Sequence, residues 1–175
     1  VGWWEKSENG KDPNVSEEAA RNARYTFFER VCREVGANTL ALAHTADDDA
    51  ETILFRLLRG TGLSGLRGIP EVRGFGPVRV IRPLKEVPHE AIRVYLRKRG
   101  ISWCEDSSNT DLRYTRNRIR HQLLPLLESR FNPNIREILT NLGRSASEDY
   151  TFLQRESETA LFEVLLAEKD REILF

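Results

Sequence analysis

Residues 39–60 read TLALAHTADDDAETILFRLLRG, and this stretch decides the fold that we expect. Its opening apolar run is short, which favours a buried strand over a helix. From Thr45 onward apolar residues recur at helical spacing as far as Gly60, and Thr45 with Asp48 three residues later matches a helix capping box. A strand, a tight polar turn and a helix in this order are typical of a parallel α/β sheet with polar residues at the carboxyl end of a strand.

The sequence on either side continues this alternation. A helix is expected between Asn14 and Gly36, with Ser16 as its N-cap. Residues 60–76 contain six glycines, so a loop is expected there. Farther along we expect a strand over 78–84, a helix over 88–99 with Pro88 as its first residue and Gly100 after its end, a short strand over 101–104, a polar loop over 105–111, and one long helix or a hairpin of two after Pro133.

The composition excludes several classes of protein. With 39% hydrophobic and 31% charged residues, the 175-residue chain has enough apolar side chains for one core, and no run of about 18 apolar residues occurs. We therefore expect a cytoplasmic protein without a membrane segment. Cys32 and Cys104 lie far apart and show no metal-ligand spacing, so no metal site and no disulfide framework are expected.

Charges are segregated along the chain, although the net charge is zero. Residues 56–120 contain 15 Lys and Arg against 6 Asp and Glu, a net charge of +9, whereas the segments before and after them have net charges of −5 and −4. A basic middle segment favours contact with a polyanion such as RNA. A solvated arginine-rich surface balanced by neighbouring acids explains the same pattern equally well.

Four acidic residues crowd the turn after the apolar run. On a helix Asp48 and Glu51 share one face, while Asp47 and Asp49 diverge to either side. Acids are favoured in the first turn of any helix, which accounts for one or two of them. The full set repels itself unless a cation binds, so the turn is a candidate site for a substrate ammonium group or for Mg²⁺.

A second polar cluster fills residues 105–121. If Thr115 caps a helix, then Arg116, Asn117 and Arg120 lie on one face, which suits phosphate oxygens and extruded bases. The alternative is that these arginines form ion pairs with acids of the loop in front of that helix.

Four stretches taken together resemble the tRNA(Ile)-lysidine synthetase family of the PP-loop ATPase superfamily. They read AHTADDDAET, LLRGTGLSGLRGI, IRPL and WCEDSSNTDLRYTRNRIRHQLLPLL, starting at Ala43, Leu57, Ile81 and Trp103. The resemblance implies a parallel-sheet, Rossmann-like nucleotide-binding domain of the PP-loop type, followed by a helical segment. It also implies a carbon–nitrogen ligase that uses ATP with Mg²⁺ to activate the wobble cytidine of tRNA(Ile) with the anticodon CAU, and then joins L-lysine to it.

The same resemblance implies roles for individual residues. Asp48 and Glu51 match the family's acidic pair, which holds the lysine ammonium, and Asp47, which lies beside them, is expected to bind lysine with them. Thr45 stands where the family often has a second His and Asp49 where it often has Gln, which makes this turn more acidic. Of the matched residues, His44, Arg59, Gly60, Thr61 and Gly62 are expected to bind the nucleotide, Arg116, Asn117 and Arg120 to bind tRNA, and Asp48, Glu51 and Arg116 to be catalytic.

The superfamily's pyrophosphate loop, Ser-Gly-Gly-x-Asp-Ser, does not occur in the sequence. We therefore expect a fragment that lacks residues before Val1 and is not a competent ATPase alone. Residues 1–128 are expected to form the catalytic domain and residues 129–175 a helical linker or subdomain, and a homodimer is left open. A tRNA thiolation enzyme would use paired cysteines, which Cys32 and Cys104 do not provide. A non-catalytic RNA-binding module, which would share the basic segment, is the alternative from another class.

Overall fold

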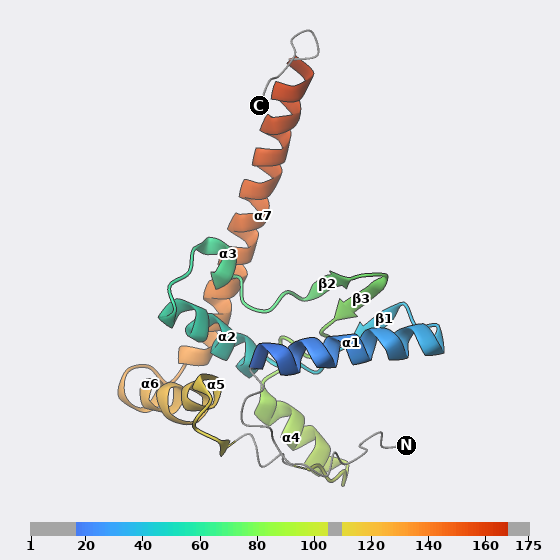
Figure 1. The fold of residues 1–175 in the computed structure, drawn as a ribbon. Helices are drawn as coiled ribbons and strands as arrows, with labels where there is room; N and C mark the ends of the chain where they lie inside the picture. Colours follow the sequence, from blue (N-terminus) through green and yellow to red (C-terminus); the bar gives the residue numbers. More distant parts are fainter. Residues whose placement is uncertain (1–16, 105–109, 168–175) are drawn as a thin grey trace. The chain divides into compact units, whose positions relative to one another are not determined.

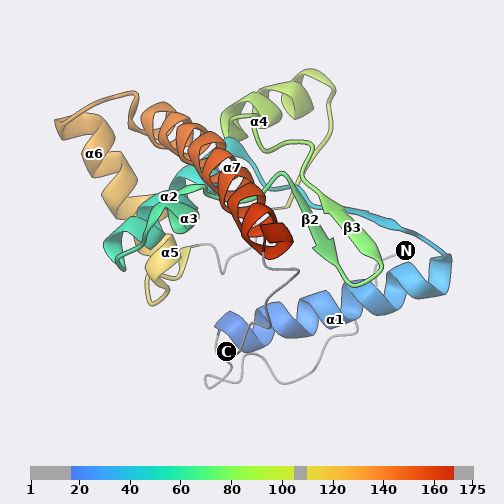
Figure 2. The same ribbon diagram turned by 90° about the horizontal axis from the view of Figure 1, so that it is seen from above.

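The computed structural model describes residues 17–104 and 110–167 (Figures 1 and 2). Its elements are α1 (Glu17–Val35), β1 (Thr39–Ala41), α2 (Ala46–Leu58), α3 (Leu63–Leu66), β2 (Val72–Phe75), β3 (Val78–Ile81), α4 (His89–Lys98), α5 (Thr115–Arg118), the π-helical turn η2 (Ile119–Leu123), α6 (Leu124–Arg130) and α7 (Ile135–Ala167). The contacts divide the chain into two units, residues 1–42 with 72–81 and residues 43–71 with 82–175.

The first unit is a small sheet with α1 packed beside it (Figure 1). The strand order is β1-β3-β2, with β1 parallel and β2 antiparallel to β3. Val80, at the centre of β3, is fully buried. The rings of Tyr25 on α1 and Phe75 on β2 meet edge to face, with their centroids 5.0 Å apart. The expected α/β class is therefore confirmed, but the sheet is mixed rather than wholly parallel, because β2 runs antiparallel to β3.

Two expectations about this region and its surroundings are wrong. The loop expected over 60–76 contains α3 and β2, because β2 gains its hydrogen bonds from β3 across the tight turn at Gly76, whose φ is +55°. The short strand expected over 101–104 does not form. Its first residue, Ile101, instead donates its backbone N–H to the carbonyl oxygen of Leu96 and closes the end of α4 around Gly100, whose φ is +66°.

The sequence predicted the start of α2 correctly, but it placed the starts of α4 and α5 one residue away from where they lie. The capping box of α2 is confirmed, because Thr45 N donates to Asp48 Oδ2 at 2.9 Å while Asp48 N donates to Thr45 Oγ1 at 3.4 Å. Pro88 is the N-cap of α4 and not its first residue. Thr115 does not cap α5; it is the first helical residue, and Tyr114 precedes it without a side-chain cap. Ser16 and most of the expected loop over 105–111 lie outside the described residues.

The core of the second unit lies where α2, η2, α6 and α7 meet. Its buried members are Ala50, Ile53, Leu54, Ile119, Leu124 and Leu139. The apolar stripe of α2 therefore packs as the helical spacing predicts. The domain boundary expected at residue 128 falls inside this unit and stays a prediction.

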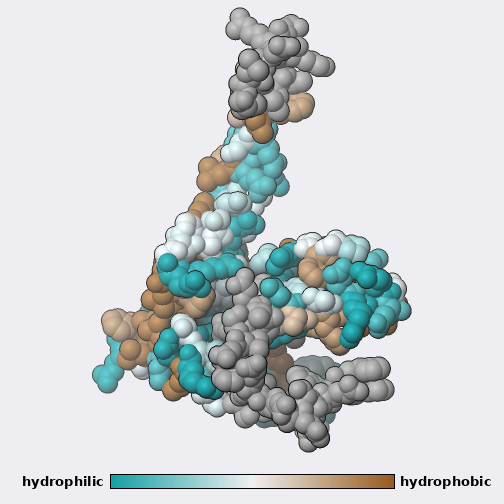
Figure 3. All heavy atoms as spheres, viewed as in Figure 1, coloured by the Kyte–Doolittle hydropathy of each residue, from teal (hydrophilic) through white to brown (hydrophobic). Residues whose placement is uncertain are grey.

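The segment after Pro133 forms one helix, α7, and not a hairpin. Its first half packs against α2 and α3, and Figure 1 shows it continuing well beyond α3. In that second half Phe152, Leu153 and Phe162 are exposed, and Figure 3 shows apolar patches along it. No helix in the described part of the chain is long and apolar enough to cross a membrane.

The crossing of α7 over α2 depends on Gly143. A Cβ atom at this position would lie 2.6 Å from Ile53 Cδ1 and 3.3 Å from the carbonyl oxygen of Leu66. Gly143→Leu is therefore expected to lower the free energy of unfolding by about 1–3 kcal/mol, as overpacking does. Urea unfolding measures the change, and Gly62→Ala, whose Cβ would meet nothing within 4 Å, is the control. Equal stabilities of the two variants would refute this packing.

Candidate functional site

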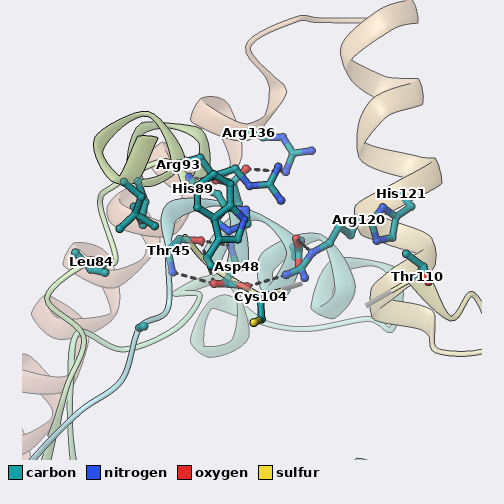
Figure 4. A pocket seen from close by; sticks show the side chains of 16 residues that line it. Thr45, Asp48, Leu84, His89, Arg93, Cys104, Thr110, Arg120, His121 and Arg136 are labelled. Carbon is teal, nitrogen blue, oxygen red and sulfur yellow. Dashed lines mark hydrogen bonds and ion pairs between the residues drawn. The ribbon is translucent and has the colours of Figure 1, made fainter. Parts of the chain in front are cut away.

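A cavity of about 590 Å³ opens at the start of α2 in the second unit (Figure 4). Its acidic and basic lining consists of Asp47, Asp48, Glu51, Arg93, Arg120 and Arg136, with the imidazoles of His89 and His121 beside them, and its apolar lining of Ala43, Leu84, Ile92, Leu96 and Trp103. The acids come from α2, the apolar wall largely from α4 and the segment after it, and the arginines from α4, η2 and α7. A charged floor beside an apolar wall suits a ligand that is polar at one end and apolar along its length.

Each acid of the turn is paired with a cation from elsewhere in the chain. The ion pairs are Asp47–Arg136 at 3.0 Å, Asp48–Arg120 at 2.8 Å, Asp49–Lys85 at 3.5 Å, and Glu51 with Arg120 at 2.6 Å and Arg116 at 3.4 Å. These acids were expected to repel one another unless a cation binds, and a basic side chain does lie beside each of them. The chain itself supplies the cations, and a bound ammonium would add to a site that is already balanced.

Arg120 joins the two acids that were expected to share a helix face. Its Nε–H donates to Glu51 Oε1, and its Nη2 donates to Glu51 Oε2 at 2.9 Å and to Asp48 Oδ1 at 2.8 Å. Burial lowers the pKa of Arg120, but the hydrogen bond and charge of Glu51 and the charge of Asp48 outweigh it, so its pKa is raised. The shared face is confirmed, and the guanidinium fixes both carboxylates.

The acids differ in how a ligand can reach them. The side chain of Glu51 is 1% exposed, whereas those of Asp48 and Asp47 are 20% and 22% exposed. Figure 4 shows Asp48 held between Thr45 and Arg120. Asp48 and Asp47 are thus the carboxylates that a ligand can touch directly, and Glu51 can act only through its neighbours.

The surroundings of Asp48 give a pH prediction. Burial raises the pKa of its carboxyl, but the hydrogen bonds from Thr45 and the charges of Arg120 and Arg116 outweigh it, so its pKa lies below the ordinary 3.8. A lowered pKa in the folded state means that ionised Asp48 stabilises the fold above pH 3.8, and that this contribution is lost as the pH falls through the folded-state pKa. Unfolding free energies of the unchanged protein and Asp48→Asn should therefore converge as the pH falls below 3.8. A constant difference down to the lowest pH would contradict the lowered pKa.

Asp49 has a structural role. Its carboxylate accepts the backbone N–H of Ile69 at 2.5 Å and pairs with Lys85, while burial raises its pKa. Gly68 lies so close that a Cβ there would be 2.3 Å from Asp49 Oδ1. Asp49 therefore anchors the turn before β2 and does not line the cavity.

His44 is held by a buried arginine. Arg82, which is 4% exposed, donates its Nε–H to His44 Nδ1 at 3.2 Å and its Nη1 to the carbonyl oxygen of Pro70 at 2.6 Å. Because a guanidinium can only donate, Nδ1 of His44 accepts and carries no proton in this arrangement. His44 follows β1 as the sequence predicts, but it does not line the cavity. Its nucleotide role stays a prediction.

The other expected nucleotide residues lie at the opposite end of α2. Arg59 is its C-cap, with its guanidinium 5.2 Å from the ring centroid of Phe55, and Gly60 follows with a φ of +78°. At about 1.5 Å per residue, α2 separates Arg59 from the acids by roughly 12–18 Å along its axis. Neither Arg59 and Gly60 nor Thr61 and Gly62 line the cavity, so the structure does not bring these four residues to the acidic turn.

The expected arginine face contacts α2. Arg116 reaches Glu51 and, at 3.2 Å, Thr52 Oγ1, while its side chain stays 42% exposed. Asn117 Nδ2 donates to the carbonyl oxygen of Asp111 at 2.9 Å. The alternative, that these arginines form ion pairs, is thus confirmed for Arg116 and Arg120, and the partners that the structure describes for them are acids of α2. Within the described part of that loop, Asp111 pairs with Arg113.

The sequence did not predict several residues that line the cavity. They are Leu84, His89, Ile92, Arg93, Leu96, Trp103, Cys104, Thr110, His121 and Arg136. The helical spacing of Ile92 and Leu96 places both on one face of α4, but nothing in this spacing indicates that the face lies at the start of α2. Among the described residues no group of three or more His, Cys, Asp and Glu is placed to hold a metal ion.

Comparison with known proteins gives consistent matches. The family model of the PP-loop domain matches residues 2–127. The tRNA(Ile)-lysidine synthases of Geobacter sulfurreducens, Chromobacterium violaceum and Bacillus subtilis are 44%, 44% and 37% identical to this chain over 145, 149 and 155 residues. These alignments cover 83%, 85% and 89% of this chain and 30%, 31% and 33% of those proteins. The chain thus spans about a third of the length of the relatives it matches.

A solved structure supports the fold. The U34-tRNA thiolase NcsA from Methanococcus maripaludis, solved with its [4Fe-4S] cluster, is similar with a TM-score of 0.59 over 84% of this chain and 50% of that one. The sequences are 16% identical, so this likeness concerns the fold alone.

Proposed function

Since this chain belongs to the PP-loop domain family, we propose that it carries the lysine site of an enzyme that joins L-lysine to the wobble cytidine of tRNA(Ile). The observation that carries the proposal is the cavity at the start of α2, where reachable carboxylates face an apolar wall. Identity of 37–44% to tRNA(Ile)-lysidine synthases over most of the chain supports the same reaction.

The two halves of the cavity suit the two parts of a lysine side chain. Asp48 and Asp47 are exposed enough to accept hydrogen bonds from an ammonium group. Ile92 and Leu96 give the methylene stem an apolar surface on which to pack. Glu51 positions Asp48 through Arg120 and does not touch the ligand.

The reaction places different demands on these groups. ATP activates the cytidine by adenylation with release of pyrophosphate, and the lysine amino group, after losing a proton, then forms the carbon–nitrogen bond as AMP leaves. Asp48, with its lowered pKa, is a weak base and is therefore suited to binding the ammonium rather than to accepting that proton. Arg116 is exposed enough for its guanidinium to meet an anionic reactant. ATP is expected with Mg²⁺, which we assign to no residue of this chain.

Lysine transfer separates this proposal from a non-catalytic RNA-binding module. The full-length protein that contains this chain is incubated with ATP, labelled L-lysine and tRNA(Ile) bearing the anticodon CAU. The proposal predicts ATP-dependent labelling of the tRNA, and loss of labelling when the wobble cytidine is replaced by uridine. Binding of tRNA without any transfer of lysine would favour the binding module. A homodimer and a cytoplasmic location stay predictions.

The salt dependence of tRNA affinity shows which of Arg116 and Arg120 contacts a tRNA phosphate. The bonds of Arg116 to α2 are 3.2–3.4 Å long, whereas those of Arg120 are 2.6–2.9 Å. We therefore expect Arg116→Ala to make the slope of log affinity for tRNA against log salt shallower by about 0.7–0.9, the value for one phosphate contact. Arg120→Ala is expected to leave the slope unchanged and to lower the melting temperature. An unchanged slope for Arg116→Ala would remove this residue from the tRNA interface.

A further inference from the structure

The cavity is also lined by an exposed indole side chain, which the proposed binding of lysine does not use. Trp103 is 40% exposed and lies in the segment just after α4. A solvent-exposed tryptophan leaves a large apolar face in water, and one that lines a cavity offers this face to a ligand that enters the cavity. The ammonium and stem of lysine are accounted for by Asp48, Asp47 and the face of α4, and this leaves the indole without a role.

The groups around the indole fit a nucleobase better than another aliphatic chain. A nucleobase has a flat π-face that stacks on aromatic side chains, and unpaired bases are the usual targets of such stacking in RNA recognition. Carboxylates are matched acceptors for the exocyclic amino group of cytosine, and arginines for phosphates. Asp47 and Arg93 bring both kinds of group to the same cavity as Trp103.

We propose that Trp103 is a stacking surface for a nucleobase that enters this cavity beside the lysine site. The inference rests on the proposed function and adds the residue that would hold the base next to the amine. The shared chemistry is a planar nucleobase, which an unpaired cytidine of RNA or the adenine of ATP can supply. We choose the RNA base as the occupant, because it would place the cytidine beside the lysine amino group to which it is joined.

This proposal is tested by measuring variants of the protein against RNAs that have or lack the base, as in a double-mutant cycle. Affinities are measured by fluorescence anisotropy for an RNA stem-loop with an unpaired loop cytidine and for the same RNA with an abasic site there. Trp103→Leu is expected to weaken binding of the cytidine RNA by about 5- to 150-fold, the usual range for one stacked base, and to leave the abasic RNA unchanged. Trp103→Phe, which keeps an aromatic face, should lose less. Phe152→Leu on α7, where the side chain is 62% exposed and outside the cavity, is the control.

The two cysteines of the chain supply an independent readout. Cys104 is exposed and lines the cavity, whereas Cys32 is buried, so iodoacetamide should alkylate Cys104 first. The cytidine RNA is expected to slow alkylation of Cys104 in the unchanged protein and in Trp103→Phe, but not in Trp103→Leu. Cys32 reports unfolding, because its alkylation rises if a variant loses its structure.

The outcomes are distinct. Equal affinities of the unchanged protein and Trp103→Leu for the cytidine RNA and for ATP would overturn the stacking role. A loss confined to ATP would support stacking with adenine as the occupant. Calorimetry with L-lysine runs alongside, and absence of lysine binding by the unchanged protein would overturn the proposed function whether or not the base stacks.

Discussion

Glu51→Gln is expected to lower the free energy of unfolding by about 3 kcal/mol, the lower end of the range for removing one partner of a buried ion pair. Both oxygens of Glu51 accept hydrogen bonds from Arg120, and the carboxylate is 1% exposed. Glutamine keeps the shape but removes the charge, so the guanidinium loses its closest anion. The lower end applies because Arg120 is itself 31% exposed. Urea unfolding of the purified chain measures the loss.

A matched control is available on α1. Glu29 also pairs with an arginine, Arg33, at 3.1 Å, but both side chains are at least 36% exposed. Glu29→Gln should change the free energy of unfolding by no more than about 0.5 kcal/mol, the usual size of an exposed pair four residues apart on a helix. If Glu51→Gln were no more damaging than this control, the buried pair would not hold the acidic turn together.

Asp48→Asn is expected to weaken lysine binding by about 30-fold or more, because breaking a desolvated charge pair costs about 2–5 kcal/mol. The amide keeps an oxygen that can accept from Thr45, so the start of α2 is preserved while the negative charge is lost. Titration calorimetry with L-lysine gives the affinities. Asp149→Asn, at an exposed position on α7, is the control and should bind as the unchanged protein does. Equal affinities of the two variants would leave Asp48 with a structural role only.

The parts of the structure that local sequence determines were predictable. Thr45 and Asp48 are three residues apart, and their capping box needs no distant partner. Apolar residues at helical spacing likewise predicted the buried face of α2, with Ile53 fully buried. Gly100 marked the end of α4, because its positive φ favours glycine.

The parts of the structure that depend on pairing between residues far apart in the sequence could not be predicted. The acids of α2 are neutralised by Lys85, Arg120 and Arg136, and nothing in local spacing tells which of many basic residues will fold back onto them. Strand β2 was not predicted from the sequence for a related reason. It is four residues long, contains Gly74 and lies in the glycine-rich stretch 60–76, and only pairing with β3 makes it a strand.

The residues that line the cavity also fall into those that the sequence predicted and those that it did not. Sequence placed Asp47, Asp48 and Glu51 together, because one helical turn joins them. Trp103 lines the cavity from a segment without regular structure, for which no periodicity exists to predict a face. Its place in the wall of the cavity is therefore visible only in three dimensions.

The most direct test of the lysine site compares L-lysine with L-norleucine, which has a similar aliphatic chain but no side-chain ammonium. Titration calorimetry on the purified chain gives both affinities at neutral pH and low salt, where ion pairing is least screened. Binding of the ammonium by Asp48 and Asp47 predicts that lysine binds at least 30-fold more tightly than norleucine, the equivalent of about 2 kcal/mol. Equal affinities, or no heat with lysine, would contradict an ammonium site at the start of α2.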